Sequence, residues 1–123
     1  MTNSSNLSVV NHYLTAFYSG DFDRARTLVS EDFAFKGPFI EAASRDAFFT
    51  SAAGLTRIVR GHRLLRQWQD GDDICSIFEM NLEAPTKTGS LPVCEWHACR
   101  QGIVVSARLL FDTAAFRQFV PAR

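Results

Sequence analysis

The sequence lacks the features that would direct it to a nucleic acid or a membrane. Lys plus Arg and Asp plus Glu both number 13, so the formal net charge is zero and the basic field typical of nucleic-acid binding is missing. No apolar run approaches the ~20 residues that cross a bilayer. The first residues also lack the basic and apolar parts of a signal peptide. We therefore expect no nucleic-acid partner and no membrane partner.

Cysteines and metal-ligand patterns are sparse as well. The three cysteines, Cys75, Cys94 and Cys99, are an odd number in a chain without an export signal, which predicts reduced thiols and a cytoplasmic location. The three histidines are widely spaced and form no metal-ligand pattern. Phosphate-binding loops, dinucleotide fingerprints and nucleophile elbows are absent from the sequence. We therefore expect no metal and no cofactor.

Phenylalanine, in contrast, is abundant. The 123 residues include 11 Phe, and 46% of the chain is hydrophobic. This length predicts one domain over residues 1–123, and area scaling predicts that folding buries about two-thirds of the chain's surface. The aromatic side chains are therefore numerous enough to fill a core without disulfides and also to line a cavity.

The chain begins with helical patterns. The apolar residues that follow helical spacing from Asn6 on are Leu7, Val10, Leu14 and Phe17. Ser19-Gly20 ends this helix, because glycine adopts the left-handed conformation of a helix C-terminus. Asp21 or Asp23 can cap a short second helix that carries apolar residues as far as Val29.

The rest of the chain predicts a sheet. Phe33, Phe35 and Phe39 alternate as in a strand, and Ser44 is placed to cap a third helix. Four strands follow at about 58–69, 74–84, 91–99 and 103–112, and a last helix runs from 113 to about 120 with Asp112 as its cap. The short turns between these strands imply antiparallel hairpins. Helices followed by an antiparallel meander predict an α+β fold, with the helices packed on one face of a sheet.

The loop length of the last hairpin determines which of its side chains face inward. Because Gln101 suits a positive φ poorly, we expect a three-residue loop, Arg100–Gly102, with the positive φ at Gly102. This register pairs Cys99 with Ile103, His97 with Val105, Glu95 with Ala107, Val93 with Leu109 and Leu91 with Phe111. It places Glu95 and His97 on an otherwise apolar inner face and Val104 on the outer face.

A slip of one residue would exchange these faces, and the two alternatives stay open at this point. The slip would turn Trp96 inward and let Glu95 pair with Arg108 outside. On the other strands we expect Ser76, Phe78, Met80, Leu82, Val59, Leu65 and Gln67 inward and His62, Leu64, Arg66 and Trp68 outward. The outer face then carries Leu64, Trp68, Ile77, Trp96, Ala98 and Leu110. An apolar patch of this kind predicts a homodimer through the outer sheet face.

Four segments of the chain resemble a known superfamily. Tyr13–Asp23 (YLTAFYSGDFD) and Asp32–Pro38 (DFAFKGP) are similar to the opening of nuclear transport factor two-like proteins. Gln101–Ile103 and Leu110–Asp112 are similar to the ending of its SnoaL-like, or polyketide cyclase-like, branch. The resemblance implies a cone-shaped, cystatin-like fold in which a curved antiparallel sheet wraps around N-terminal helices and leaves an apolar pocket. Such proteins include cyclases, isomerases, epoxide hydrolases, dehydratases and binders without catalysis, so the fold alone does not choose an activity.

The resemblance also indicates which residues of this chain match the catalytic positions of known family members. Tyr13 matches the tyrosine donor of ketosteroid isomerase, whereas that enzyme's base and second donor fall at Gly37 and near Cys94. The Asp-Arg-Asp set of limonene epoxide hydrolase falls on the apolar residues Phe78, Met80 and Leu109. Neither of these two activities is therefore expected. The pocket histidine of the SnoaL-type cyclases falls near Glu95.

Glu95 is the best candidate for a functional residue. In an apolar pocket it would act as a general base, with His97 beside it as a proton-relay partner and Tyr13 as a hydrogen-bond donor. The residues expected to contact a ligand are Phe17, Phe33, Phe35, Val59, Leu65, Phe78, Met80, Val93, Ala107, Leu109 and Phe111. We expect a protein that binds an apolar cyclic or aromatic metabolite, as a cofactor-free isomerase, dehydratase or cyclase. The alternative is a non-catalytic ligand-binding or dimerising module.

Overall fold

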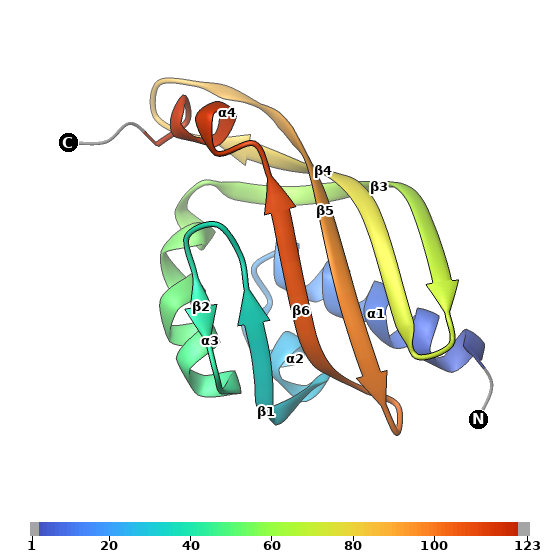
Figure 1. The fold of residues 1–123 in the computed structure, drawn as a ribbon. Helices are drawn as coiled ribbons and strands as arrows, with labels where there is room; N and C mark the ends of the chain where they lie inside the picture. The colour runs from blue at the N-terminus through green and yellow to red at the C-terminus, as the bar shows by residue number, and fades with distance from the viewer. Residues whose placement is uncertain (1–2, 121–123) are drawn as a thin grey trace.

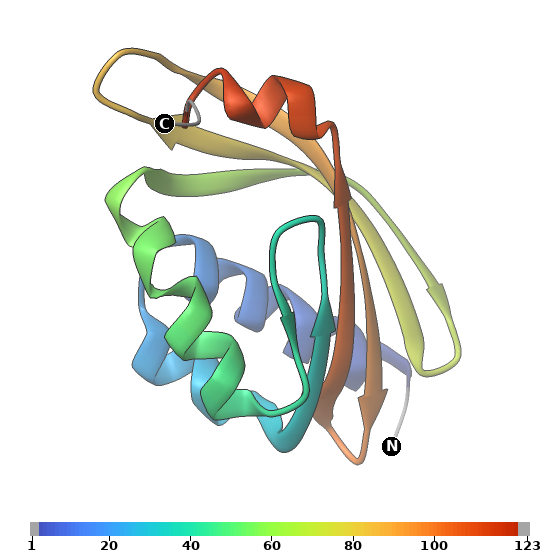
Figure 2. The same ribbon diagram turned by 60° about the vertical axis from the view of Figure 1, so that its left-hand side comes forward.

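Six strands form one curved sheet that wraps around the N-terminal helices (Figures 1 and 2). The computed structural model describes residues 3–120, with side chains from Asn6 on. Its helices are α1 (Asn3–Tyr18), α2 (Phe22–Thr27), α3 (Arg45–Ala52) and α4 (Thr113–Arg117), and a short 3-10 segment, η1 (Ala53–Arg57), follows α3. Its strands are β1 (Val29–Lys36), β2 (Glu41–Ala42), β3 (Val59–Asp70), β4 (Asp73–Glu83), β5 (Thr88–Arg100) and β6 (Ile103–Phe111). The predicted α+β fold class is confirmed.

Short polar residues fix where the helices begin. The side chain of Asp21 accepts from the Arg24 backbone N–H at the start of α2. Ser44 accepts from the Ala47 N–H at the start of α3. Asp112 accepts from the first turn of α4 in the same way. Each contact satisfies a backbone donor that the helix leaves unpaired, so these residues act as the caps that the sequence predicts.

The order of the sheet is β2-β1-β6-β5-β4-β3. The hairpins β3–β4, β4–β5 and β5–β6 are antiparallel as predicted, whereas β1 lies parallel to β6. The first strand also differs in its bounds, since it starts at Val29, which the sequence placed in the second helix, and ends before Phe39. The parallel pair is possible because β2, α3 and the meander separate β1 from β6 along the chain.

The predicted loop of the last hairpin is wrong, but its inward face is right. Gln101 does adopt a positive φ of 53°, so that Gln101 and Gly102 form a two-residue turn and Arg100 pairs with Ile103. A bulge next to Cys99 then adds one residue to β6, which turns Val104 inward near the turn and restores the expected alternation beyond it. Glu95 consequently faces inward opposite Leu109.

The outward alternative for Glu95 is therefore excluded. Glu95 is only 2% exposed, and Trp96, not Glu95, lies opposite Arg108 on the outer face. The inward residues predicted for β4 and β5 are buried as well, among them Ser76 and His97.

Two predictions for β3 are wrong because the strand is bulged. Gly61 has a φ of 136°, which favours glycine, and the pairing with β4 shifts there. The shift brings His62 opposite Met80 and against the rings of Tyr18 and Phe78, so His62 faces inward and not outward. A second bulge leaves Leu65 45% exposed instead of inside.

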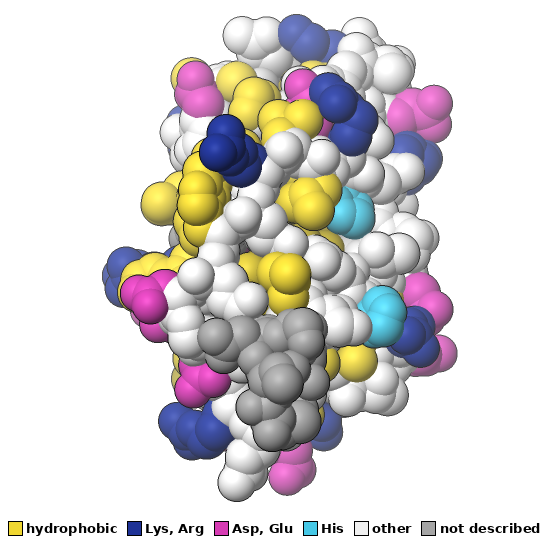
Figure 3. Space-filling model, turned by 90° about the vertical axis from the view of Figure 1, so that its right-hand side faces the viewer, with side chains coloured by type: hydrophobic (Ala, Val, Ile, Leu, Met, Phe, Trp, Pro, Cys, Tyr) yellow, Lys and Arg dark blue, Asp and Glu magenta, His cyan; other side chains and the backbone are white. Residues whose placement is uncertain are grey.

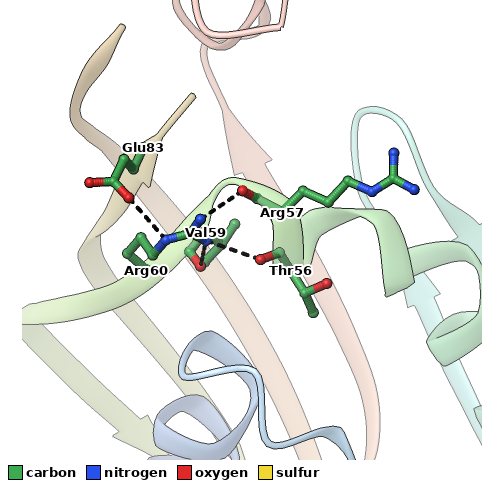
Figure 4. A network of polar contacts seen from close by, with 5 residues as sticks. All are labelled: Thr56, Arg57, Val59, Arg60 and Glu83. Atoms are coloured by element: carbon green, nitrogen blue, oxygen red, sulfur yellow. Dashed lines mark hydrogen bonds and ion pairs between the residues drawn. The ribbon is translucent and has the colours of Figure 1, made fainter. Parts of the chain in front are cut away.

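An arginine fixes the corner where η1 meets β3 (Figure 4). The Arg60 guanidinium donates to the carbonyl oxygens of Thr56, Arg57 and Val59 at 2.9–3.1 Å and lies 3.2 Å from Glu83 Oε1. Backbone carbonyls at the end of a helix need such donors. The Arg60 contacts therefore set the position of η1. No helix among the described residues is both long and apolar enough to cross a membrane.

Candidate functional site

A cavity of about 60 Å³ lies inside the cone, between the sheet and helices α1 and α3. Its walls are mainly aromatic rings, and the six phenylalanines among them are Phe17, Phe35, Phe39, Phe48, Phe111 and Phe116. Leu55, Met80 and Leu109 complete much of the apolar surface. At one side Phe39, on the β1–β2 turn, packs against Phe111 and Phe116. The cavity is therefore suited to apolar and aromatic molecules.

Glu95 and Tyr18 are the polar side chains of this lining. Glu95 extends from the middle of β5, and Tyr18 extends from the last turn of α1. The Tyr18 hydroxyl donates to Glu95 Oε1 at 3.3 Å, and both residues are buried. A carboxylate held in an apolar cavity has few solvent contacts, so water screens its interactions with neighbouring groups only weakly.

His97 lies behind Glu95, away from the cavity. Its Nε2 is 3.4 Å from Glu95 Oε2, and the ring is fully buried. The Tyr13 ring meets the His97 ring edge to face, with centroids 5.6 Å apart. Within residues 3–120, the Tyr13 hydroxyl and both His97 nitrogens are buried without a hydrogen-bond partner. Buried polar atoms without a hydrogen-bond partner lower the stability of a fold, and functional sites often contain such atoms.

The surroundings of Glu95 shift the pKa values of neighbouring groups. Burial raises the pKa of Tyr18 well above its ordinary value, and the negative charge of Glu95 raises it further. Burial and the same charge raise the pKa of Tyr13. Both phenols therefore stay protonated and able to donate a hydrogen bond. Burial lowers the pKa of His62, and the Glu95 charge opposes that shift.

The structure brings together only part of the predicted site. Phe17, Phe35, Met80, Leu109, Phe111 and Glu95 line the cavity. Phe33, Phe78, Val93 and Ala107 are buried in the core and Val59 borders a separate small hollow. Leu65 is on the surface, and Tyr13 and His97 lie behind the cavity wall. Of the three predicted catalytic residues, Glu95 and His97 are thus in contact, and Tyr13 contacts His97.

Tyr18 is the important residue that the sequence prediction missed. Val10, Leu14 and Tyr18 follow one another at intervals of four residues, so Tyr18 continues the buried row along α1. That spacing was the available signal for it. Phe39 and Phe116 were missed because the β1–β2 turn and α4 are joined to the cavity only by the tertiary fold.

Metal ligation has no support in the geometry of this part of the chain. Among residues 3–120, no three His, Cys, Asp or Glu side chains come together as a metal site.

The chain matches one known protein family. The SnoaL-like domain model matches residues 10–107, which is most of the chain. The chain belongs to the SnoaL-like domain family. The resemblance found in the sequence is thereby confirmed. No match is found among curated proteins.

Solved structures have the same fold as this SnoaL-like domain. A nuclear transport factor two-like protein of unknown function from Burkholderia pseudomallei has a TM-score of 0.83 at 17% identity, over 99% of this chain and 100% of that one. A putative SnoaL-like polyketide cyclase from Jannaschia has a TM-score of 0.83 at 13% identity, over 98% and 94%. An LEH-like epoxide hydrolase from M. tuberculosis has a TM-score of 0.79 at 17% identity, over 98% of both chains. The TM-scores show a common fold, and at these low identities the activity has to be argued from the site itself.

Proposed function

We propose that this SnoaL-like domain binds an apolar cyclic or aromatic metabolite in the inner cavity and catalyses a cofactor-free proton transfer on it. The observation that carries the proposal is that Glu95 is the one acidic side chain in a cavity wall made otherwise of apolar residues and Tyr18. A carboxylate with little solvation is a stronger base toward a carbon acid than one in water. The reaction class is that of an isomerase, dehydratase or cyclase.

The proposed step is removal of a proton from a carbon next to a carbonyl group. Glu95 takes the proton, and the electrons of the C–H bond move into the enolate. Tyr18 turns its hydroxyl from Glu95 to the enolate oxygen, because a phenol that stays protonated can stabilise the developing charge. Return of the proton at another carbon completes an isomerisation.

His97 and Tyr13 support this step from behind in the proposal. His97 Nε2 lies 3.4 Å from Glu95 Oε2 without a hydrogen bond between them, and a rotation of either side chain that forms this bond would let the two groups exchange a proton. Tyr13 packs against His97 and restricts its ring. Tyr13 thus acts as a positioning residue, and Tyr18 takes the donor role first expected of Tyr13.

The test uses a small cyclic ketone, cyclohexanone, in deuterated water. Exchange of its α-protons, followed by NMR, measures proton removal without knowledge of the natural substrate. Glu95→Gln should lower the protein-dependent exchange rate by about 10²-fold or more, the usual contribution of a general base. Glu79→Gln is the matched control, because Glu79 lies on neighbouring β4 and pairs with Arg63 at the surface. Equal rates for wild type and Glu95→Gln would reject the proposal.

A second candidate is a ligand-binding or dimerising module without catalysis. The small volume of the cavity, about 60 Å³, and its dense phenylalanine lining favour the dimerising module, because they leave little room for a ligand. In that case cyclohexanone would undergo no protein-dependent exchange.

The outer sheet face is proposed to form a homodimer. Trp68 and Leu110 are each exposed on it, and contact with a second copy would remove them from water. A dimeric mass by light scattering at about ten micromolar is expected, and Leu110→Glu should shift it toward the monomer. A monomeric mass of the wild type would reject the dimer. Cytoplasmic location stays a prediction.

A further inference from the structure

A second recess lies on the outer face of the sheet, across β5, β6, β1, β2 and the residue that follows β2. Its volume is about 460 Å³, against about 60 Å³ for the inner cavity. Sites for small molecules usually have about 300–1,000 Å³. The outer recess, which we call the outer groove, is therefore the larger of the two spaces and has no part in the proton transfer proposed above. A dimer through Trp68 and Leu110 has to leave this groove open for a ligand to bind in it.

Two neighbouring rows of side chains shape the outer groove. Trp96 pairs with Arg108, and Arg108 pairs with Lys36, so these three long side chains form one row across β5, β6 and β1. In the next row Ser106 pairs with Ala34. A row of long side chains beside a row of short ones produces a step in the surface, and this step is the groove.

The basic residues of the groove form no ion pair within the described residues, although Glu41 also lines the groove. Lys36 and Arg108 are directly paired on adjacent strands, an arrangement that is unfavourable for like charges unless an anion lies between them. Within the described residues neither forms a hydrogen bond or an ion pair, whereas Arg60 and Arg63 of β3 pair with Glu83 and Glu79. Glu41 pairs with Lys36 across β2 in register but not as an ion pair.

Trp96 supplies a fixed aromatic surface at the end of this row. Its indole Nε1–H donates to Asp73 Oδ1 at 3.2 Å, which restricts the rotation of the ring. The side chain is nevertheless 48% exposed, so part of the ring is free to contact a ligand. A held aromatic ring loses little conformational entropy when a second ring packs against it.

We propose that the outer groove binds an aromatic carboxylate. The ring of the ligand packs on Trp96, and its carboxylate lies between Arg108 and Lys36. The Arg108 guanidinium matches a carboxylate in a planar, two-bonded arrangement, and Lys36 adds a second charge. Neither an anion without a ring nor a ring without a charge uses all three residues.

The test follows the indole N–H signal of Trp96 by NMR, since the protein has only two tryptophans. Benzoate is the probe, and acetate and benzyl alcohol separate the contributions of charge and ring. Benzoate should shift the signal to saturation, with an affinity at least about tenfold higher than that of either control compound. Lys36→Gln/Arg108→Gln should weaken benzoate binding by about tenfold or more.

Matched variants keep this result specific. Arg100→Gln removes an exposed arginine from the same hairpin and should leave benzoate affinity unchanged. Glu95→Gln should also leave it unchanged, which separates the outer groove from the inner cavity. The proposal is overturned if benzoate gives no saturable shift, if benzyl alcohol binds equally well, or if the double variant binds like wild type. A dimer that covers the groove would also abolish the shift and overturn it.

Discussion

The inner cavity and the outer groove lie on opposite faces of the same strands, and their charged groups differ. The cavity contains a buried carboxylate, whereas the groove contains exposed basic side chains. In β1, Phe35 lines both recesses, whereas Lys36 lines only the groove. In β5, Glu95 faces the cavity and Trp96 the groove. The carboxylate inside is enclosed by rings, whereas the cations outside are in contact with water. Alternation along a strand thus lets one sheet carry two distinct chemistries.

The difference predicts unequal energetic effects for charged groups on the two faces. An ionic or strongly polar group in the interior depends on its partner, because water cannot replace it. A charged group on the surface is solvated whether or not it is paired, so its removal changes stability little. Variants that remove one group from either face measure this contrast.

The largest effect is expected at His97. His97→Leu removes the group that lies 3.4 Å from Glu95 Oε2 and leaves the buried carboxylate with the Tyr18 hydroxyl as its remaining polar partner. The free energy of unfolding should fall by about 3 kcal/mol, measured by urea denaturation. Arg108→Leu on the outer face should change it by less than about 0.5 kcal/mol.

The double variant Glu95→Leu/His97→Leu sharpens this prediction. It replaces both polar groups by apolar ones, so it should be more stable than His97→Leu alone. Equal stability of the two variants would mean that Glu95 gains nothing from His97.

Alkaline pH provides the second test of the interior. The protein has two tyrosines, and both are buried with a pKa raised by burial and by Glu95. In the unfolded chain they lose their protons near pH 10, so stability is retained below about pH 10 and falls as the pH rises above it. Tyrosinate absorbance should appear only together with the loss of the circular dichroism of the fold. A tyrosine that titrates near pH 10 in the folded protein would contradict the burial of the site.

The fold was predictable because its signals are local. Helical spacing in α1, the caps Asp21, Ser44 and Asp112, and the short turns each act within a few residues. The face of Glu95 was correctly expected although the turn was wrong, since the two-residue turn and the bulge each shift the register by one. Two such shifts restore the original alternation.

The site was less predictable because it depends on bulges and on distant segments. The bulge at Gly61 turned His62 inward, and the second one exposed Leu65. A glycine within a strand pattern signals such a bulge, but not how far it shifts the pairing. Tyr18 reaches Glu95 across 77 residues of sequence, a contact that no local pattern contains.

The smallest effect is expected at His62, whose side chain is only partly buried. Burial lowers its pKa in the folded protein, so the unfolded chain binds a proton first as the pH falls below about 6.5. Stability is then complete at higher pH and decreases by less than about 1 kcal/mol as the pH falls, because His62 is partly solvated. His62→Gln should reduce this decrease, as followed by urea denaturation from pH 7 to pH 5. An unchanged pH dependence in this variant would show that His62 does not contribute.

The most direct test of the account measures both recesses in the same variants. Cyclohexanone α-proton exchange reports on the inner cavity, and benzoate binding at Trp96 reports on the outer groove. Glu95→Gln should lower the exchange by about 10²-fold and leave benzoate binding unchanged, while Lys36→Gln/Arg108→Gln should do the opposite. Full exchange activity in Glu95→Gln would contradict the central claim that the buried carboxylate of β5 is the base.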